Sequence, residues 1–373
     1  MKVVVLPQPH QIRLGFFFHG EQFDPWSFNI GARISADDDT SLEGLGLLLA
    51  ARSVDSFTIR PQELGNIEVW MTKKRTYPQT APAPRESRTF TGPLTVGSAS
   101  QESIRMFVGN LQAFYPESAF PAFLNSAGRL IDMLSAGEYD LCLALDDRGQ
   151  VAGGILWNFL SDRAVECCGP YLFGPELEAC AQDLMDAVIN RIAKTSAVCL
   201  VSRWATPDVP HGTFEVLGKI HSFTLAEGMA EVPVLGRFLK EDEGLYVWTT
   251  PELEKYLGEQ YGRLCIARRL LPAREEGERR RRHSVIAAHI DQQHQSALLT
   301  LALDGEDLES NILQQVASLL LHGVCVIHFE LDLASAQKAR LAPILMRNGF
   351  EPRLVLPHAG AGDIVLLEKV LHP

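Results

Sequence analysis

The chain has 373 residues, of which 46% are hydrophobic and 21% are charged, a balance typical of ordinary globular proteins with two or three domains. Its formal net charge of −12 argues against a general nucleic-acid-binding or anionic-membrane surface. It has no run of about 18 apolar residues, and its first residues do not form a signal peptide. We therefore expect a cytoplasmic protein with no nucleic-acid partner and no membrane partner.

The seven cysteines favour the same compartment. Their number is odd, and several lie in apolar runs such as 141–144 and 198–201, which predicts buried thiols in a reducing cytosol. No CxxC or Cys/His spacing is present, so we expect no metal site. The one strongly basic run, 279–283, follows an acidic stretch. We interpret it as a solvated loop, with contact to nucleic acid or phosphate as the alternative.

The first elements along the chain are short. Apolar alternation predicts strands over 3–6 and 12–18, a buried helix over 42–53, and a hairpin with strands 57–60 and 67–73. Residues 76–99 are rich in Pro, Thr, Ser and Gly, which indicates a linker. This linker is the clearest domain boundary in the sequence.

Two series of strands and helices follow the linker. In the first we expect helices over 102–113, 127–135 and 176–194, the last with Pro175 in its first turn, and strands over 140–145, 151–159, 165–172 and 197–203. A charged stretch over 237–296 predicts one helix, 251–267, among loops. In the second series we expect strands over 298–303, 324–331, 353–356 and 363–370, with helices over 308–321 and 334–348. The two series look like distant copies of one unit.

Two motifs near the N-terminus carry a family resemblance. The segment Gly20-Glu-Gln-Phe-Asp-Pro25, followed by Asp39-Thr-Ser-Leu-Glu-Gly-Leu-Gly-Leu47, resembles the C-terminal part of the histidine-kinase-like (Bergerat-type) ATPases. The likeness is greatest to the anti-sigma-factor serine/threonine kinases. The resemblance implies a remnant ATP loop with Asp24, Gly44 and Gly46, where glycines let backbone amides approach phosphates.

The same segment departs from that family at two places. The magnesium-binding Asn of the family lies on a helix that would precede residue 1, so we expect this helix to be missing. Phe18 stands where the family has the Asp that binds adenine, and a phenyl ring cannot accept that hydrogen bond. We therefore expect a truncated half-domain whose ATP site is lost.

The chain beyond the linker resembles the GNAT acyltransferase superfamily. The supporting segments are 146–154, a strand–turn–strand motif, then Phe214-Glu-Val-Leu-Gly218, and Leu345-Met-Arg-Asn-Gly-Phe350. The resemblance implies two parallel strands that splay apart, with acetyl-CoA between them and its pyrophosphate at a helix N-terminus. It assigns the cofactor contacts to Gly169, Phe173 and Gly174.

The cofactor loop departs from the family pattern as well. Pro175 stands where an amide donor would help, and Glu176 and Glu178 would repel a pyrophosphate. The corresponding stretch of the second unit, 303–309, is equally acidic. We therefore expect no bound cofactor, with acetyl-CoA as the alternative.

Few residues are candidates for catalysis or ligand binding. Glu166 is the candidate general base and Tyr171 the candidate acid, the other interpretation of Glu166 being a solvent-facing strand residue. Arg203 and Trp204 follow a strand end, where pockets of α/β sheets gather. There Arg203 could clamp an anion and Trp204 stack on a ring, whereas Trp204 could equally belong to the core.

These observations predict an α/β protein with mixed sheets. We expect a truncated ATPase module over 1–75, a linker over 76–99, a first GNAT-like unit over 100–236, a connector over 237–284 and a second GNAT-like unit over 285–373. The leading functional hypothesis is a regulatory or ligand-binding protein with a protein partner or a small-molecule ligand. The alternatives are an active CoA-dependent N-acyltransferase and an anti-sigma-type kinase completed by an upstream chain. An exposed sheet edge in the N-terminal module also predicts a homodimer.

Overall fold

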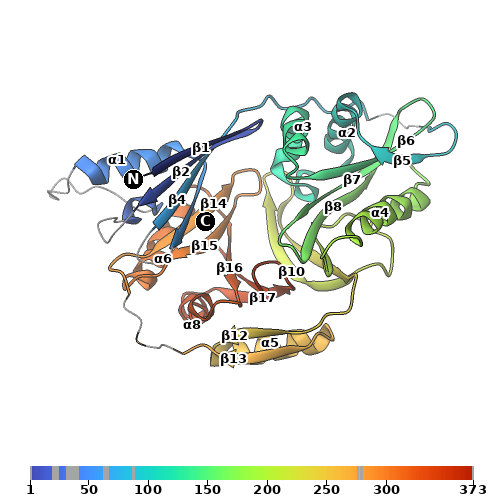
Figure 1. Cartoon of the computed structure of the whole chain (residues 1–373). Coiled ribbons are helices and arrows are strands. Elements are labelled where there is room, and N and C mark those ends of the chain that lie inside the picture. The colour runs from blue at the N-terminus through green and yellow to red at the C-terminus, as the bar shows by residue number, and fades with distance from the viewer. Residues whose placement is uncertain are drawn as a thin grey trace.

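The computed structural model describes residues 2–18, 25–30, 42–61, 67–85, 89–274, 277 and 280–371. Within these ranges the strands form sheets of four, seven, two and five strands, so the fold is a mixed α/β fold with several sheets. Figure 1 shows the four-stranded and seven-stranded sheets on opposite sides of the molecule, with the five-stranded sheet below and between them. None of the described helices has the length and apolar content needed to cross a membrane.

The N-terminal module is an antiparallel sheet of order β1-β2-β4-β3. Its elements are β1 (Lys2–Gln8), β2 (Gln11–Phe18), η1 (Pro25–Phe28), α1 (Leu42–Ser53), β3 (Ser56–Pro61) and β4 (Ile67–Lys74). The predicted hairpins and the helix over 42–53 are thus confirmed, but the helix is not buried as expected, since Leu49 is 61% exposed. The ATPase resemblance is not confirmed, because Gly20–Asp24, with Asp24 itself, and Asp39–Ser41 lie outside the described residues.

The seven-stranded sheet forms the first unit and has the order β10-β11-β9-β8-β7-β6-β5. Helices α2 and α3 cover one face of this sheet, and α4 covers the other. Successive residues of β6 point to opposite faces, so alternate side chains of β6 pack against the two groups of helices. The strands are β5 (Thr95–Ser98), β6 (Asp140–Leu145), β7 (Val151–Phe159), β8 (Ala164–Leu172), β9 (Cys199–Trp204), β10 (Glu215–Thr224) and β11 (Gly228–Phe238). The helices are α2 (Gln101–Phe114), α3 (Ala127–Ser135) and α4 (Glu178–Ile192), with short 3-10 turns η3 (Glu117–Ala119) and η4 (Ala122–Asn125).

Three features of this unit differ from the prediction. Strand β5 lies inside the stretch interpreted as a linker. Its four residues lie among prolines and glycines and show no apolar alternation, so the sequence pattern did not predict it. Helix α4 begins at Glu178 rather than at 176, since Glu176 has a left-handed φ of 57° that a helix cannot include. The hairpin of β10 and β11 extends the unit beyond the last strand predicted for it, 197–203.

The second unit repeats the topology of the first. Its sheet order is β14-β15-β16-β18-β17, with β15 and β16 parallel and joined by α6, as β8 and β9 are parallel and joined by α4. The strands are β14 (Val285–Asp291), β15 (Ser296–Leu303), β16 (Val326–Asp332), β17 (Glu351–Leu356) and β18 (Ile364–Val370). The helices are α6 (Leu308–Leu321), α7 (Ala336–Ala339) and α8 (Ala342–Arg347). The predicted single helix over 334–348 is two helices, because Pro343 starts α8.

The connector between the units contains more strand than the charged sequence indicated. A parallel pair, β12 (Leu245–Thr249) and β13 (Arg268–Pro272), encloses α5 (Pro251–Arg263), and β14 follows within the stretch expected to be loop. The Arg268 side chain is fully buried and its guanidinium lies 2.6 Å from Asp363 Oδ2 and 2.8 Å from Asp242 Oδ2. Burial opposes the charge of Asp242, but its hydrogen bond from Arg268 helps lower its pKa to about 2.

The two units and the connector share one hydrophobic core. Val201 and Ile220 of the first unit lie in the same buried cluster as Leu257 of the connector and Phe329 of the second unit. A buried carboxylate also joins the units, because Glu368 Oε1 lies 2.6 Å from His221 Nδ1. The relative position of the units is therefore set by packing and by specific polar contacts.

Asn29 ties the N-terminal module to the second unit. Its side chain is buried, and its Nδ2 donates to the Ser284 carbonyl at 2.9 Å. Its Oδ1 accepts from the Ile286 amide and from the side chains of Asn311 and Gln315, each at 3.1 Å. One amide group thus satisfies four buried partners, which is the strongest polar constraint on how the module docks.

We predict that Asn29→Ala destabilises the protein by at least about 2 kcal/mol, because each buried polar group left without a partner costs about 1–3 kcal/mol. The free energy of unfolding in urea measures this loss. Gln182→Ala, on the exposed face of α4, is the matched control and should change stability by less than about 0.5 kcal/mol. Equal stability of the two variants would show that Asn29 does not fix the docking.

Candidate functional site

The pairing of β8 with its parallel partner β9 stops before β8 ends. The last paired residues are Cys168 and Trp204, where β9 ends, whereas β8 continues to Leu172. Gly169 follows the last pair with a φ of 97°, a conformation that side chains rarely adopt. The register of the pair shifts between Glu166 and Cys168, but this pairing does not test the expectation that the two strands splay apart.

The space beside the end of β8 is filled by side chains of the protein itself. The Leu172 amide donates to the Tyr115 hydroxyl at 2.5 Å, and that hydroxyl also bonds to the Asp208 carboxylate. The Thr206 hydroxyl donates to the Pro170 carbonyl at 2.6 Å. Burial, together with Asp208, raises the pKa of Tyr115, so its hydroxyl stays protonated. The main-chain groups that a cofactor would use on β8 already have partners.

The predicted cofactor loop is equally closed. The Phe173 amide donates to the Ala152 carbonyl at 2.9 Å, and the Phe173 ring is fully buried among other aromatic rings. Gly174 follows it, and α4 begins without a side-chain cap. The residues 169–178 include no Lys or Arg. Gly169 thus lies within β8, with Phe173 and Gly174 directly after the strand, and no cationic side chain of 169–178 is present to bind a diphosphate.

Glu166, the candidate base, is committed to an ion pair. Arg203 approaches its carboxylate with two nitrogens, at 2.5 Å and 3.1 Å, and the pair is largely buried. A third group, Glu330 of the second unit, lies 3.5 Å from the same guanidinium. Burial raises the pKa of Glu330, although Arg203 works in the opposite direction. Glu166 therefore acts as the partner of a cation that links two units.

Tyr171 and Trp204 are placed by packing. The Tyr171 side chain is fully buried and its hydroxyl donates to the Ala119 carbonyl at 3.0 Å. Burial raises its pKa well above the ordinary value. The Trp204 ring centre lies 5.1 Å from that of His294, so Trp204 and Arg203 point to different neighbours. The structure does not unite Glu166 with Tyr171, or Arg203 with Trp204, in one pocket.

The glycines of the suggested ATP loop lie within helix α1. Gly44 and Gly46 occupy its first turns, and Gly46 is exposed, with no atom within 4 Å of where a Cβ would stand. A side chain at position 46 would therefore meet no described atom, so close packing does not require a glycine there.

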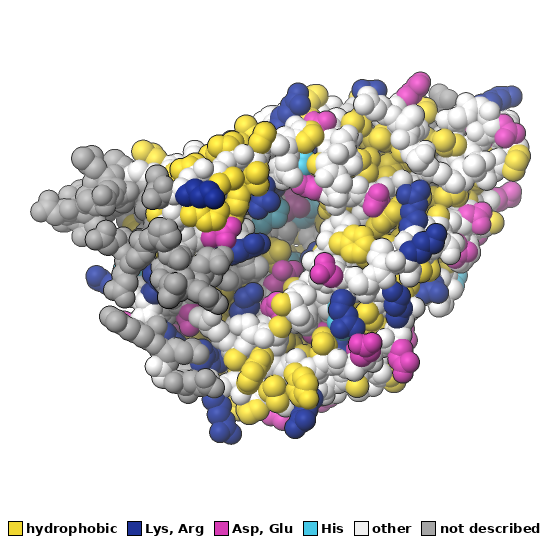
Figure 2. All heavy atoms as spheres, in the orientation of Figure 1, with side chains coloured by type: hydrophobic (Ala, Val, Ile, Leu, Met, Phe, Trp, Pro, Cys, Tyr) yellow, Lys and Arg dark blue, Asp and Glu magenta, His cyan; other side chains and the backbone are white. Residues whose placement is uncertain are grey.

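A separate cavity lies where the three parts of the molecule meet. We call it the junction cavity; it measures about 570 Å³. Figure 2 shows the hollow at the centre of this face of the molecule. The N-terminal module, α3 with the start of β6, the end of β7, and β14 all contribute residues to it. Its lining consists of His10, Gln11, Lys74, Phe123, Arg129, Met133, Gly137, Glu138, Tyr139, Asp140, Trp157, Asn158, Phe159 and His289.

One side of the junction cavity is cationic. Burial lowers the pKa of Lys74, and the nearby Arg129 lowers it further. Burial also lowers the pKa of Arg129 and of His289, the latter with help from Lys74. Among the described residues, neither the Lys74 nor the Arg129 side chain has an ion-pair partner within 4 Å. Arg129 thus disfavours the charge of Lys74, although Asp55, Glu138 and Asp291 act on its pKa in the opposite direction, and a bound anion would favour that charge further.

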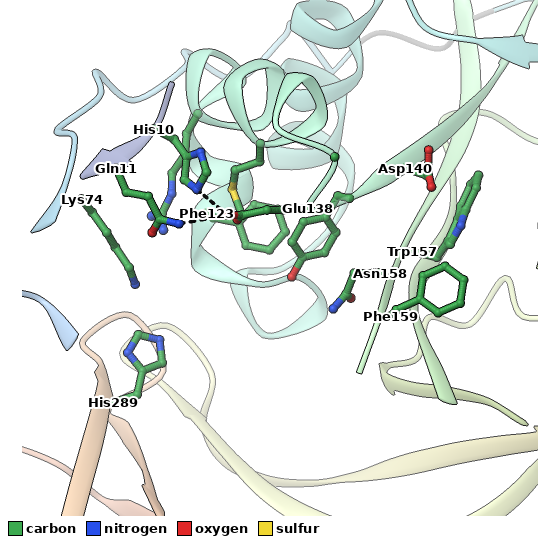
Figure 3. Close-up of a pocket in the computed structure, with 14 residues that line it drawn as sticks. His10, Gln11, Lys74, Phe123, Glu138, Asp140, Trp157, Asn158, Phe159 and His289 are labelled. Carbon is green, nitrogen blue, oxygen red and sulfur yellow. Dashed lines mark hydrogen bonds and ion pairs between the residues drawn. The ribbon is translucent and has the colours of Figure 1, made fainter. Parts of the chain in front are cut away.

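The carboxylates of the junction cavity are arranged differently. Glu138 Oε1 lies 2.9 Å from His10 Nε2 and 2.9 Å from Gln11 Nε2, so this carboxylate already has partners (Figure 3). Asp140 is exposed at the opposite side, near Trp157. Neither carboxylate therefore lies in an ion pair with Lys74.

The other side of the junction cavity is aromatic. The Phe123 and Tyr139 rings lie 4.8 Å apart, and Figure 3 shows Trp157 and Phe159 across the cavity from His289. Between them, Asn158 Oδ1 is buried and has no hydrogen-bond partner. Asn158 also pairs with Glu166 across the β7–β8 ladder, which places the cavity next to the Arg203 ion pair. The junction cavity thus has a cationic end, an aromatic end and one amide oxygen without a partner. These are features of a small-molecule site.

Sequence reasoning identified none of these lining residues. They come from segments that the sequence divides among separate domains, and no motif connects them. The only available signal was the presence of polar residues at strand ends, such as Lys74 and Asn158, which is common in proteins of this size. Within the described residues, no group of three or more His, Cys, Asp or Glu is placed to hold a metal ion.

No family model matches the chain, and no curated protein matches it. Several solved structures are similar to part of it. An N-acetyltransferase from Staphylococcus aureus Mu50 is 11% identical, covers 40% of this chain and 100% of its own, and has a TM-score of 0.34. A GNAT superfamily phosphinothricin acetyltransferase from Sinorhizobium meliloti, solved in complex with AcCoA, is 18% identical, with 40% and 89% covered and a TM-score of 0.31. An aminoglycoside 6'-acetyltransferase type Ii is 8% identical, with 39% and 98% covered and a TM-score of 0.32.

We predict that Arg203→Met destabilises the protein by about 3–5 kcal/mol, because it leaves Glu166 buried without its cation. Urea unfolding measures the change. The double variant Arg203→Met/Glu166→Gln is the control, since it removes the buried charge and should recover at least half of the loss. A double variant no more stable than the single one would mean that packing around Arg203, rather than the ion pair, carries its contribution.

Proposed function

We propose that this chain is a regulatory, ligand-binding protein built on an acyltransferase-like scaffold, in which the junction cavity takes a small anionic molecule with an aromatic or planar body. The observation that carries the proposal is a contrast within the first unit. The end of β8 is closed by Tyr115 and Thr206, whereas the junction cavity stays open.

The chemistry of the junction cavity supports this ligand class. An anionic group would lie between Lys74 and Arg129, where it would offset the repulsion of two partly desolvated cations. His289 would add a neutral donor, because its lowered pKa keeps the ring uncharged at pH 7. An aromatic body would pack against Phe123 and Phe159, the latter 45% exposed at the cavity.

The same geometry disfavours acyl transfer. A catalytic base must reach the proton that it removes, and Glu166 is held by Arg203. A CoA-dependent N-acyltransferase, the alternative function, would require Tyr115 and Thr206 to leave β8 at the cost of several buried hydrogen bonds.

The proposal predicts that phenyl phosphate binds in the junction cavity and that its affinity depends on the two cations. Lys74→Met and Arg129→Gln should each weaken binding about tenfold, the effect of one charge-assisted hydrogen bond. Isothermal titration calorimetry with phenyl phosphate measures this. Lys73→Met is the matched control, because Lys73 is the neighbouring lysine on β4, pairs with Asp55 and does not line the cavity.

Titration of acetyl-CoA is the second arm of the experiment. We expect no binding at the end of β8 tighter than about 1 mM, because the Leu172 amide and the Pro170 carbonyl already have partners. Acetyl-CoA carries linked phosphates that cations elsewhere in the chain can bind, so the titration is repeated with Arg281→Ala, a substitution outside the first unit. Micromolar binding of acetyl-CoA that Arg281→Ala leaves unchanged would favour the acyltransferase alternative. Phenyl phosphate binding that Lys74→Met and Arg129→Gln leave unchanged would remove the junction cavity as the ligand site.

A further inference from the structure

In the second sheet, the pairing of β15 with its parallel partner β16 also stops before β15 ends. Residues of β15 and β16 pair from Ser296 with Val326 to Thr300 with Glu330. Beyond Thr300, β15 continues to Leu303 with β14 as its partner, and β16 continues to Asp332 with β18 as its partner. The two strands are thus not paired with each other over their last residues.

The space beside β15 is open on the side of β14 and β3, and no residue of β16 is among the described residues that line it. A cavity of about 690 Å³, which we call the β15 cavity, begins at Thr300 and follows β15 to Asp304. Strand β3 of the N-terminal module and helix α7 form its other walls. No side chain corresponding to Tyr115 closes it among the residues that line it.

Four cations line the β15 cavity: Arg60, Arg280, Arg281 and Lys338. Among the described residues of its lining, Asp304 carries the one carboxylate, and Arg280 Nε lies 3.6 Å from its Oδ2. Within the described part of the chain, Arg60, Arg281 and Lys338 have no ion-pair partner. The chain as a whole carries 46 acidic and 34 basic side chains, so this concentration of positive charge is opposite to its average.

Two backbone amides between β15 and α6 already have partners. The Gly305 amide donates to Asp304 Oδ1 at 2.8 Å, and the Glu306 amide donates to the Arg281 carbonyl at 2.8 Å. Recognition in the β15 cavity therefore depends on side chains. Arginine suits phosphate oxygens particularly well, because its planar guanidinium donates two parallel hydrogen bonds.

We propose that the β15 cavity binds a molecule that carries two or more linked phosphate groups. The cations come from β3, from 280–281 and from α7, so they surround the cavity from separate directions. A single phosphate group is small relative to about 690 Å³ and could reach only some of them. Linked phosphates place negative charge at several points and can meet more of the cations at once. Two arginines of the basic run, Arg280 and Arg281, which the proposed function does not use, thereby acquire a role.

The test is calorimetric titration of inorganic pyrophosphate and of inorganic phosphate into the full-length protein at low ionic strength. We expect pyrophosphate to bind at least about tenfold more tightly than phosphate, and its affinity to fall steeply with added salt. Arg281→Ala and Lys338→Ala should each weaken pyrophosphate binding about tenfold, since each removes a charge-assisted contact. Far-UV circular dichroism shows that each variant remains folded.

Arg282→Ala is the matched control, because Arg282 is exposed, adjacent to Arg281 and absent from the lining of the cavity. It should alter pyrophosphate affinity less than twofold. Three results would overturn the proposal. Pyrophosphate does not bind, it binds no more tightly than phosphate, or its affinities for Arg281→Ala and Arg282→Ala are equal. The outcome is independent of phenyl phosphate binding, because none of the four cations lines the junction cavity.

Discussion

Two parallel strands that separate leave main-chain donors and acceptors without their sheet partners, and every such group that is buried must find another. This protein meets the constraint in two ways. In the first unit, Tyr115 and Thr206 supply side-chain partners to Leu172 and Pro170, which closes the space. In the second unit, β15 keeps its β14 partner, and a cavity lies between β15, β3 and α7. Side chains thus close the space at the end of β8, whereas a cavity remains beside β15.

The secondary structure could largely be predicted from the sequence, because hydrophobic periodicity is local. The strands 140–145 and 151–159 and the helices 127–135 and 308–321 have the bounds that the pattern indicates. Periodicity failed where an element is short or irregular. Strand β5 has four residues among prolines and glycines, and Glu176 takes a left-handed conformation that delays the start of α4.

The candidate sites were less predictable, because they depend on tertiary contacts between distant segments. Residue type singled out Glu166 as a base, yet only the fold shows that Arg203 is its partner and that Glu330 joins them from the second unit. The junction cavity combines Lys74, Arg129 and His289, which belong to three different parts of the chain. No spacing rule can bring such residues together in advance, since their proximity is produced by the docking of the units.

Buried charges at the boundaries between parts explain why this docking is specific. Arg203 with Glu166 and Glu330, Arg268 with Asp242 and Asp363, and Glu368 with His221 and His328 each join different parts of the chain. Such pairs contribute little net stability, because the cost of removing charges from water offsets most of their attraction, but a misplaced partner is strongly penalised. They therefore select one arrangement of the units over others that would bury similar apolar area.

A cavity formed between parts that are held by such contacts is coupled to their arrangement. Any ligand that binds only the docked state stabilises it by an amount that grows with the logarithm of one plus the ratio of its concentration to its Kd. The residues that carry the cations of the junction cavity lie on opposite sides of the boundary between the N-terminal module and the first unit. A bound anion would thus act in the same direction as Asn29, which ties that module to the second unit. Under the proposed function, ligand binding and domain docking are for this reason parts of one equilibrium.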